Sequence, residues 1–373
     1  MRVVSLSLRD FRSYEQTRLT LGDGLTVIAG PNGAGKTNLL EAAYFGCTGR
    51  SPRTSNEREV VRFGAPAARV AVHFEDESGR HEITVGFAAG QPKRVRLDGA
   101  SIERLLDAPG RPLVSVFLPD RLELIKGPPA LRRGHVDQLV AALWPPRAQT
   151  RRAYAQALAQ RNALIGRIRS GLSSESSLLS WDAQLAGHAV RLMEDRDQAV
   201  AAIAERCRRI SLELGLQAEL QVSYRRRSHA VTPEKFAEEL RERCAQDVER
   251  GFCTHGPHRD ELTTRLADRE LRAFGSQGQQ RVSLLALLLA EREAIAAQRD
   301  APPLMLLDDV LSELDPLRRR ALIDLLRSAP GQSVITTTDP DHVPGVDGVD
   351  VRWLEVSDGQ VLEGALTGAG EVT

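Results

Sequence analysis

The chain has 373 residues, and its 50 basic and 50 acidic side chains leave a formal net charge of zero. This length is enough for two domains with full hydrophobic cores, and the balanced charge excludes a uniformly basic or acidic protein, so any basic surface has to be local. We expect a cytoplasmic protein that spans no membrane, because its four cysteines form no C-x-x-C pair, its start does not resemble a secretory signal, and no apolar run reaches the ~20 residues of a membrane span.

Short strands are predicted in the first third of the chain, because apolar and polar residues alternate there between turn-forming segments. The expected strands are 2–8, 17–29, 68–74, 82–87, 94–97 and 113–118, the last of them stopping at residues 119 and 120. This part of the chain is therefore expected to be rich in sheet.

A glycine-rich segment joins the apolar run 25–29 to a helical run that begins at residue 38. Its residues are Gly30, Pro31, Asn32, Gly33, Ala34, Gly35, Lys36 and Thr37. They match the pattern G-x-x-x-x-G-K-[ST] in the strand–loop–helix context that gives this pattern its meaning. Such a loop points backbone N–H groups and a helix N-terminus at phosphate oxygens, with Lys36 reaching the β- and γ-phosphates and Thr37 holding Mg²⁺. The segment predicts a site for a nucleoside triphosphate and Mg²⁺.

Helices are predicted in the middle of the chain. From about residue 130 to 215, apolar residues recur at intervals of three and four, interrupted at 171–177. We expect two or three long antiparallel helices inserted into an ATPase domain. A strand at 220–224, a capped helix at 233–249 and a strand at 262–271 are expected to follow.

A second candidate anion site lies in the segment 274–281. Ser276, Gly278 and Gln279 come at the start of a long apolar helix, where a serine and a glycine favour anion binding. A single nucleotide needs only one phosphate-binding loop, so we interpret this second anion site as contacting the nucleotide bound by another subunit. An ordinary capped helix is the alternative interpretation.

An apolar strand at 304–308 ends in two carboxylates. Asp308 is placed to hold Mg²⁺ across from Thr37, and Asp309 to polarise the attacking water as general base. A helix at 316–327, strands at 333–338, 352–356 and 360–362, and a frayed polar tail at 364–373 are expected after it.

The order of these motifs is that of ABC-type ATPase heads. The predicted fold class is α/β, an ABC-type P-loop ATPase head with a mixed sheet and an inserted antiparallel helical arm domain. The expected parts are 1–128 for the N-terminal part of the head, 129–245 for the arm, and 246–373 for the C-terminal part of the head.

A local basic surface is indicated by the absence of Asp and Glu between residues 140 and 174. The candidate DNA contacts in this run are Arg147, Arg151, Arg152 and Arg161, and a second cluster follows at 225–227. Contacts to phosphates would be independent of sequence and sensitive to salt. Few aromatic residues interleave the run, which favours contact with a duplex backbone over base stacking on a single strand. The alternative is a solvated helix face.

Several motifs resemble those of the RecF family of SMC-like repair ATPases. They are residues 11–14, 30–38, 117–122 with 126–128 and 132–133, 254–262, 276–281 and 307–315. The resemblance runs from residue 2 to about 360. It implies a homodimer that forms with ATP on DNA at single-strand/double-strand junctions of gaps, cooperates with RecO and RecR in loading RecA, and hydrolyses ATP slowly with stimulation by DNA.

The same resemblance implies roles for individual residues. Arg12 and Asn38 would contact the nucleotide, and Ser276 with Gln279 would contact phosphate across a dimer. An ABC head ordinarily has glutamate where Asp309 stands, and the shorter side chain is consistent with slow turnover.

Two other classes share part of this pattern. The nucleotide-binding subunit of an ABC transporter has the same head motifs but lacks so long a helical insert. A phosphate-loop kinase for a small molecule would not need the second phosphate cradle.

Overall fold

The computed structural model describes residues 1–105, 108, 110–118, 122–299, 301–345, 351–357 and 359–363. The expected strand end at residues 119 and 120 and the expected tail at 364–373 lie outside the described residues. The chain divides into two compact units, which we call unit 1 (1–121 and 295–373) and unit 2 (122–294).

An antiparallel sheet in unit 1 has the strand order β2-β1-β4-β5-β6-β7. Its strands are β1 (Arg2–Phe11), β2 (Tyr14–Thr20), β4 (Ala67–Asp76), β5 (Gly79–Ala88), β6 (Arg94–Leu97) and β7 (Ala100–Ser101). The expected single strand at 17–29 is wrong, because the chain breaks at residues 21–24 and the two halves join different sheets. The first half pairs with β1 as a hairpin.

A mixed sheet in unit 1 has the order β15-β14-β3-β13-β12-β8. Its strands are β3 (Leu25–Ala29), β8 (Val114–Phe117), β12 (Leu304–Leu307), β13 (Ser333–Thr337), β14 (Val351–Ser357) and β15 (Gln360–Glu363). Every residue of β3, β12 and β13 is buried, as expected for central parallel strands, which read as continuous apolar runs. Because these three strands are parallel neighbours, the segments after residues 29 and 307 leave the sheet at the same edge.

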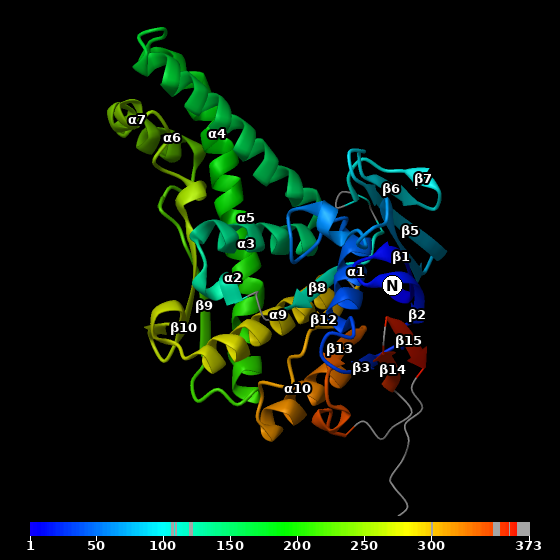
Figure 1. Cartoon of the computed structure of the whole chain (residues 1–373). Helices are drawn as coiled ribbons and strands as arrows, with labels where there is room; N and C mark the ends of the chain where they lie inside the picture. Colours follow the sequence, from blue (N-terminus) through cyan, green and yellow to red (C-terminus); the bar gives the residue numbers. More distant parts are fainter. Residues whose placement is uncertain are drawn as a thin grey trace, which may run out of the picture. The chain divides into compact units, whose positions relative to one another are not determined.

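Helix α1 (Lys36–Thr48) contacts strands of both sheets of unit 1 (Figure 1). Both sheets and α1 contribute to a single core cluster that includes Phe11, Phe45, Val72 and Leu306. Helix α10 (Pro316–Ser328) comes after β12 and the two aspartates that follow this strand, and the Asp315 side chain caps it.

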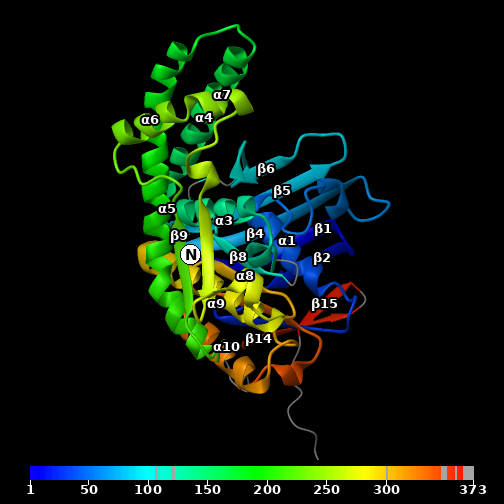
Figure 2. The same ribbon diagram turned by 90° about the vertical axis from the view of Figure 1, so that its left-hand side faces the viewer.

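Unit 2 contains the long helices. Its helices, short and long, are α2 (Glu123–Lys126), α3 (Pro129–Leu143), α4 (Ala148–Arg169), α5 (Leu179–Glu213), α6 (Pro233–Glu242), α7 (Cys244–Arg250), α8 (Leu271–Phe274) and α9 (Gln277–Arg299), the last of which carries the chain back to unit 1. Helices α4 and α5 lie side by side, and α6 packs on α5 (Figures 1 and 2). The expected helix at 233–249 is two helices, which Arg243 separates.

A three-stranded sheet explains why unit 2 extends beyond the expected arm of 129–245. Strand β9 (Leu220–Arg225) pairs with β10 (Glu261–Leu266), which pairs with β11 (Arg269–Glu270). This pairing ties residues after 260 to the helical arm, although we expected them in the head. The predicted strand 262–271 is in fact this hairpin, with Ala267 and Asp268 at positive φ in its turn.

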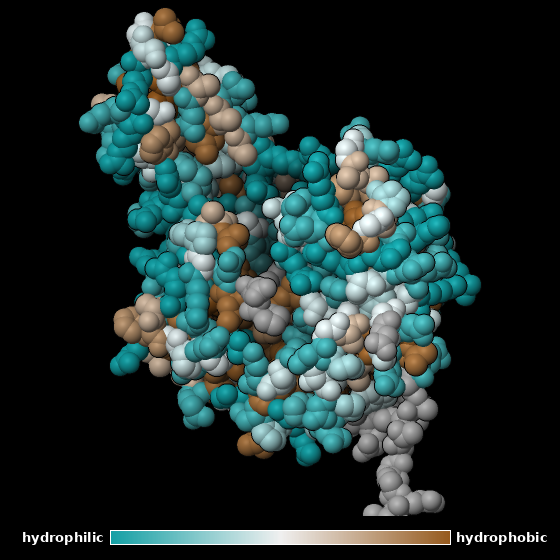
Figure 3. Space-filling model, viewed as in Figure 1, coloured by the Kyte–Doolittle hydropathy of each residue, from teal (hydrophilic) through white to brown (hydrophobic). Residues whose placement is uncertain are grey.

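Hydrophilic side chains predominate on the face of the molecule that Figure 3 shows. Among the helices of the described part of the chain, none is both long enough and apolar enough to cross a membrane.

Candidate functional site

The glycine-rich loop connects β3 to α1 in unit 1 as predicted. Gly35 has a φ of 110°, and a Cβ on it would lie 2.7 Å from the Tyr14 hydroxyl. Gly30 is as constrained, since its Cβ would lie 2.2 Å from the carbonyl oxygen of Val356. Neither position accepts a side chain, so the loop keeps its backbone open and ends at the N-terminus of α1.

Lys36 extends over this loop. Its Nζ donates hydrogen bonds to the carbonyl oxygens of Gly30 at 2.7 Å and Pro31 at 2.9 Å. Burial lowers the pKa of Lys36, while the negative charges of Asp309 and Asp308 act in the opposite direction. The ammonium group is thus held above the phosphate loop by two carbonyls and faced by two carboxylates.

Asp308 meets Thr37 at the edge of the sheet. The Thr37 hydroxyl lies 3.0 Å and 2.8 Å from the two carboxylate oxygens, and the Thr336 hydroxyl donates to one of them at 2.7 Å. A hydroxyl and a carboxylate are hard oxygen ligands of the kind that Mg²⁺ takes beside nucleotide phosphates. The residues therefore fit the expected ion, for which Thr37 and Asp308 would be the protein ligands.

Asp309 has a strained backbone and one unsatisfied oxygen. Its φ is +46°, and its N–H donates to the Thr336 hydroxyl at 2.9 Å. Ser312 donates to the carboxylate Oδ2 at 3.0 Å. The other oxygen, Oδ1, is buried and has no hydrogen-bond partner among the described residues. A free carboxylate oxygen beside the phosphate loop fits the acceptor that an attacking water needs.

Glu41, which no sequence motif marked, holds the side chains of Arg12, Arg53 and Ser51 beside α1. This carboxylate is fully buried in α1 and accepts two hydrogen bonds from Arg12, at 2.9 and 2.7 Å, and one each from Arg53 and Ser51. Arg53 also donates to the Asn38 side chain at 3.0 Å. An acidic residue one turn into the helix could have signalled a buried partner for the arginine.

Ser276, Gly278 and Gln279 lie exposed at the start of α9, in unit 2. Ser276 and Gln279 bond reciprocally: the Gln279 N–H donates to the serine hydroxyl at 3.2 Å, and the Ser276 N–H donates to the glutamine Oε1 at 2.9 Å. This is a capping box, and it leaves the helix N-terminus facing solvent.

Three of the four candidate DNA-contacting arginines lie at the surface around the start of α4. Arg147 lies over the Trp144 ring and donates to Asp195 and Gln198, whereas Arg151 and Arg152 are exposed. The expectation for Arg161 is wrong. Its side chain is fully buried and donates to Asp182 at 2.6 Å and Asp247 at 2.7 Å.

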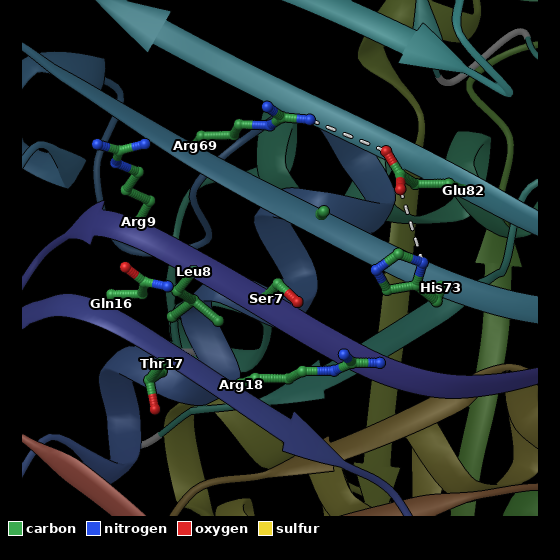
Figure 4. A pocket seen from close by; sticks show the side chains of 10 residues that line it. Ser7, Leu8, Arg9, Gln16, Thr17, Arg18, Arg69, His73 and Glu82 are labelled. Atoms are coloured by element: carbon green, nitrogen blue, oxygen red, sulfur yellow. Dashed lines mark ion pairs between the residues drawn. The ribbon is translucent and has the colours of Figure 1, made fainter.

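A shallow basic cavity of about 710 Å³ lies on the outer face of the antiparallel sheet. Figure 4 shows Arg9, Arg18 and Arg69 around it, with ion pairs that join Glu82 to Arg69 and to His73. It is separate from the glycine-rich loop, whose residues do not line it.

Comparison with known proteins gives a consistent result. The family model described as RecF/RecN/SMC N terminal domain matches residues 2–350. The chain is 38% identical to the DNA replication and repair protein RecF of Myxococcus xanthus (strain DK1622), with 97% of each chain covered. It is 38% identical to the protein of that name from Anaeromyxobacter dehalogenans (strain 2CP-C), with 97% of this chain and 99% of the relative covered.

Solved structures agree with the sequence relatives. The recombination mediator protein RecF-ATP in the RecFOR pathway superposes with a TM-score of 0.85 at 26% identity, with 98% of each chain covered. The Smc head bound to the C-winged helix domain of ScpA has a TM-score of 0.61 at 18% identity over 98% of each chain, a likeness that concerns the fold alone. With its phosphate loop and paired aspartates, the chain belongs to the RecF family of SMC-like, ABC-type ATPases.

Proposed function

We propose that this protein binds ATP and DNA in recombinational repair and replication restart, and that ATP closes a homodimer on DNA at gap junctions. The contact between Thr37 and Asp308 carries the proposal, because it brings together a hydroxyl and a carboxylate suited to a nucleotide-bound metal, in a chain whose relatives are named DNA replication and repair proteins. Those relatives also favour it over a transporter's nucleotide-binding subunit.

In the nucleotide site, residues 30–38 cradle the phosphates of ATP and Lys36 donates to its β- and γ-phosphates. Thr37 and Asp308 would hold Mg²⁺, which would neutralise charge on the phosphates. Arg12, oriented by Glu41, contacts the nucleotide from the hairpin between β1 and β2.

Hydrolysis depends on Asp309. Its free Oδ1 accepts a proton from the attacking water, while Ser312 fixes Oδ2. Aspartate is one methylene shorter than the glutamate usual at this position, so the base reaches the water less well and turnover is slow. Slow hydrolysis, stimulated by DNA, suits a switch that resets after the clamp has acted.

Dimerisation uses the exposed N-terminus of α9. Ser276, Gly278 and Gln279 of one copy contact the γ-phosphate held by the other copy, so that ATP lies between two protomers. Arg147, Arg151 and Arg152 contact the duplex backbone, and RecR and RecO are the partners with which the protein helps to load RecA.

Sedimentation velocity tests this proposal. Wild-type protein is expected to be monomeric alone and dimeric with Mg·ATP, and gapped DNA is expected to strengthen the dimer. A protein that stays monomeric under all these conditions, or that sediments with membranes rather than with gapped DNA, would contradict it.

A further inference from the structure

Unit 2 contains a cavity of about 900 Å³ that the ATPase site does not explain. Its walls come from the start of α3, the end of β9, Arg243 between α6 and α7, the end of α7, the segment 252–259, and strands β10 and β11. Seven arginines line it, at positions 133, 225, 226, 227, 243, 250 and 259. We call it the arginine pocket.

Carboxylates do not balance this charge. The two glutamates that line the pocket are engaged elsewhere, since Glu261 bonds to Arg132 at 2.6 and 3.0 Å and Glu270 lies 3.9 Å from Arg272. Within the described residues, Arg226 is the one pocket arginine that forms an ion pair, with Asp197. Six guanidinium groups are therefore left facing one cavity without a carboxylate partner.

The fold holds these groups in place through the backbone. Arg225 ends β9 opposite Glu261, and the N–H of Arg227 donates to the buried Asp260 side chain at 2.7 Å. Arg133 donates to the Asp260 carbonyl at 3.1 Å. Burial and the positive charges of Arg196 and Arg259 lower the pKa of Arg133, against the opposite effect of the carboxylates of Glu261 and Asp260. A rigid cluster of unpaired guanidinium groups is suited to phosphate, which arginine binds with two parallel hydrogen bonds.

One aromatic side chain lies among the arginines. Phe252 is 41% exposed, and the Arg259 guanidinium lies 5.5 Å from its ring centroid. A basic groove with an accessible aromatic ring is the combination by which proteins bind single-stranded nucleic acid, with phosphates in the groove and a base stacked on the ring. The cavity is of the size that takes a small ligand, which suits a few nucleotides of one strand and not a duplex.

We propose that the arginine pocket binds the backbone of single-stranded nucleic acid, with one base stacked on Phe252. The proposal rests on the DNA-related function above and adds a site for the unpaired strand of a junction, distinct from the duplex contacts of α4.

Fluorescence anisotropy of the full-length protein tests it, with a labelled oligothymidylate of about 12 nucleotides and a duplex of equal length, both without ATP. Arg225→Glu is expected to weaken oligothymidylate binding by about tenfold or more. It is also expected to lower the salt slope, the steepness with which the logarithm of the binding constant falls with the logarithm of the salt concentration, by about 1. Phe252→Ala is expected to weaken it by about tenfold at an unchanged slope. The matched control is Arg191→Glu, a reversal of an exposed arginine on α5, which is expected to change binding by less than about threefold.

Duplex binding should be nearly unchanged in Arg225→Glu, and Arg225→Gln should give an intermediate loss if the protein remains folded by circular dichroism. The pocket proposal is wrong if the wild type does not bind the oligonucleotide, or if Arg225→Glu binds it as tightly as Arg191→Glu. It is also wrong if Arg225→Glu loses affinity for polyglutamate while its affinity for the oligonucleotide is unchanged, because the pocket would then bind an acidic protein segment. Oligonucleotide binding that depends on the pocket in a protein that never dimerises with ATP would instead contradict the proposed function alone.

Discussion

The Thr37 hydroxyl lies 2.8 Å and 3.0 Å from the two carboxylate oxygens of Asp308, although 271 positions of chain separate the residues. Parallel strands bring them together, since β13 pairs with both β3 and β12 and all three end at one edge. The structure thus joins the two halves of the candidate nucleotide site, which lie far apart in the chain, and Lys36, next to Thr37, is the cation that we propose for it.

Replacing Lys36 with methionine should abolish the response to ATP. The ammonium group is expected to form charge-assisted hydrogen bonds to phosphate, so its loss should weaken ATP binding by about 10- to 100-fold. Lys235→Met, at an exposed position of α6, is the control and should bind normally. Isothermal titration calorimetry with Mg·ATP measures both. Equal affinities of the two variants would remove Lys36 from the site.

Replacing Asp309 with asparagine should separate binding from hydrolysis. The amide can still accept the Ser312 hydrogen bond but cannot take a proton, so turnover should fall by about 100-fold while ATP binding stays near wild type. The dimer with ATP should then persist for longer in sedimentation runs. Asp324→Asn, on the exposed side of α10, should behave as wild type. Loss of ATP binding in Asp309→Asn would show that the residue holds the nucleotide and does not act as a base.

The positions of the loop 30–37 and of the strand 304–307 could be predicted from the sequence, because each carries its signal within a few residues. It did not reveal partners that are distant in the chain. The buried role of Glu41 depends on Arg12, which lies 29 positions earlier, and local periodicity has no means to show such a pair. Arg161 fits a basic helix face by composition, yet Asp182 and Asp247, 21 and 86 positions away, bury it. The extent of unit 2 was missed for the same reason, since it depends on the pairing of β9 with β10.

Ser276→Arg should yield a protein that binds ATP and stays monomeric. A bulky cation at the exposed capping position of α9 would block the approach of another copy's phosphate without touching residues 30–37. Ser176→Arg, in the exposed turn before α5, controls for the added charge and should dimerise with ATP. Sedimentation velocity at saturating Mg·ATP compares them. If the Ser276 variant dimerises as the control does, this helix end is not the contact in trans.

Removing the buried arginine should affect stability more than DNA binding. Arg161→Ala leaves Asp182 and Asp247 as uncompensated buried carboxylates, which should reduce the free energy of unfolding by about 3–5 kcal/mol. Arg152→Ala, at the surface of α4, should change it by less than about 0.5 kcal/mol. Urea denaturation measures both changes. At temperatures where Arg161→Ala remains folded, the salt dependence of its duplex binding should equal that of wild type. A slope lowered by about 1 would show that Arg161 contacts a phosphate after all.

Acid should destabilise the protein through His258. Its Nε2 donates to the carbonyl of Cys253 at 3.0 Å, and its Nδ1 accepts from the Tyr154 hydroxyl at 2.6 Å, which is the pattern of a neutral ring. Burial lowers the pKa of His258 to about 4, from 6.5 in an exposed ring. As pH falls, the unfolded chain therefore takes up the proton before the folded protein does. The stability that depends on a neutral His258 is fully present above pH 6.5 and is lost between pH 6.5 and 4.

The loss over that interval should approach about 3 kcal/mol for this residue. Urea titrations at a series of pH values between 7 and 4.5 measure it, and His258→Gln should show a flatter pH dependence from a lower starting stability. His229→Gln, at an exposed position, should keep the wild-type slope. A His258 variant as sensitive to acid as wild type would show that other groups govern acid unfolding, and that the pKa of the ring between Tyr154 and Cys253 is not lowered by folding.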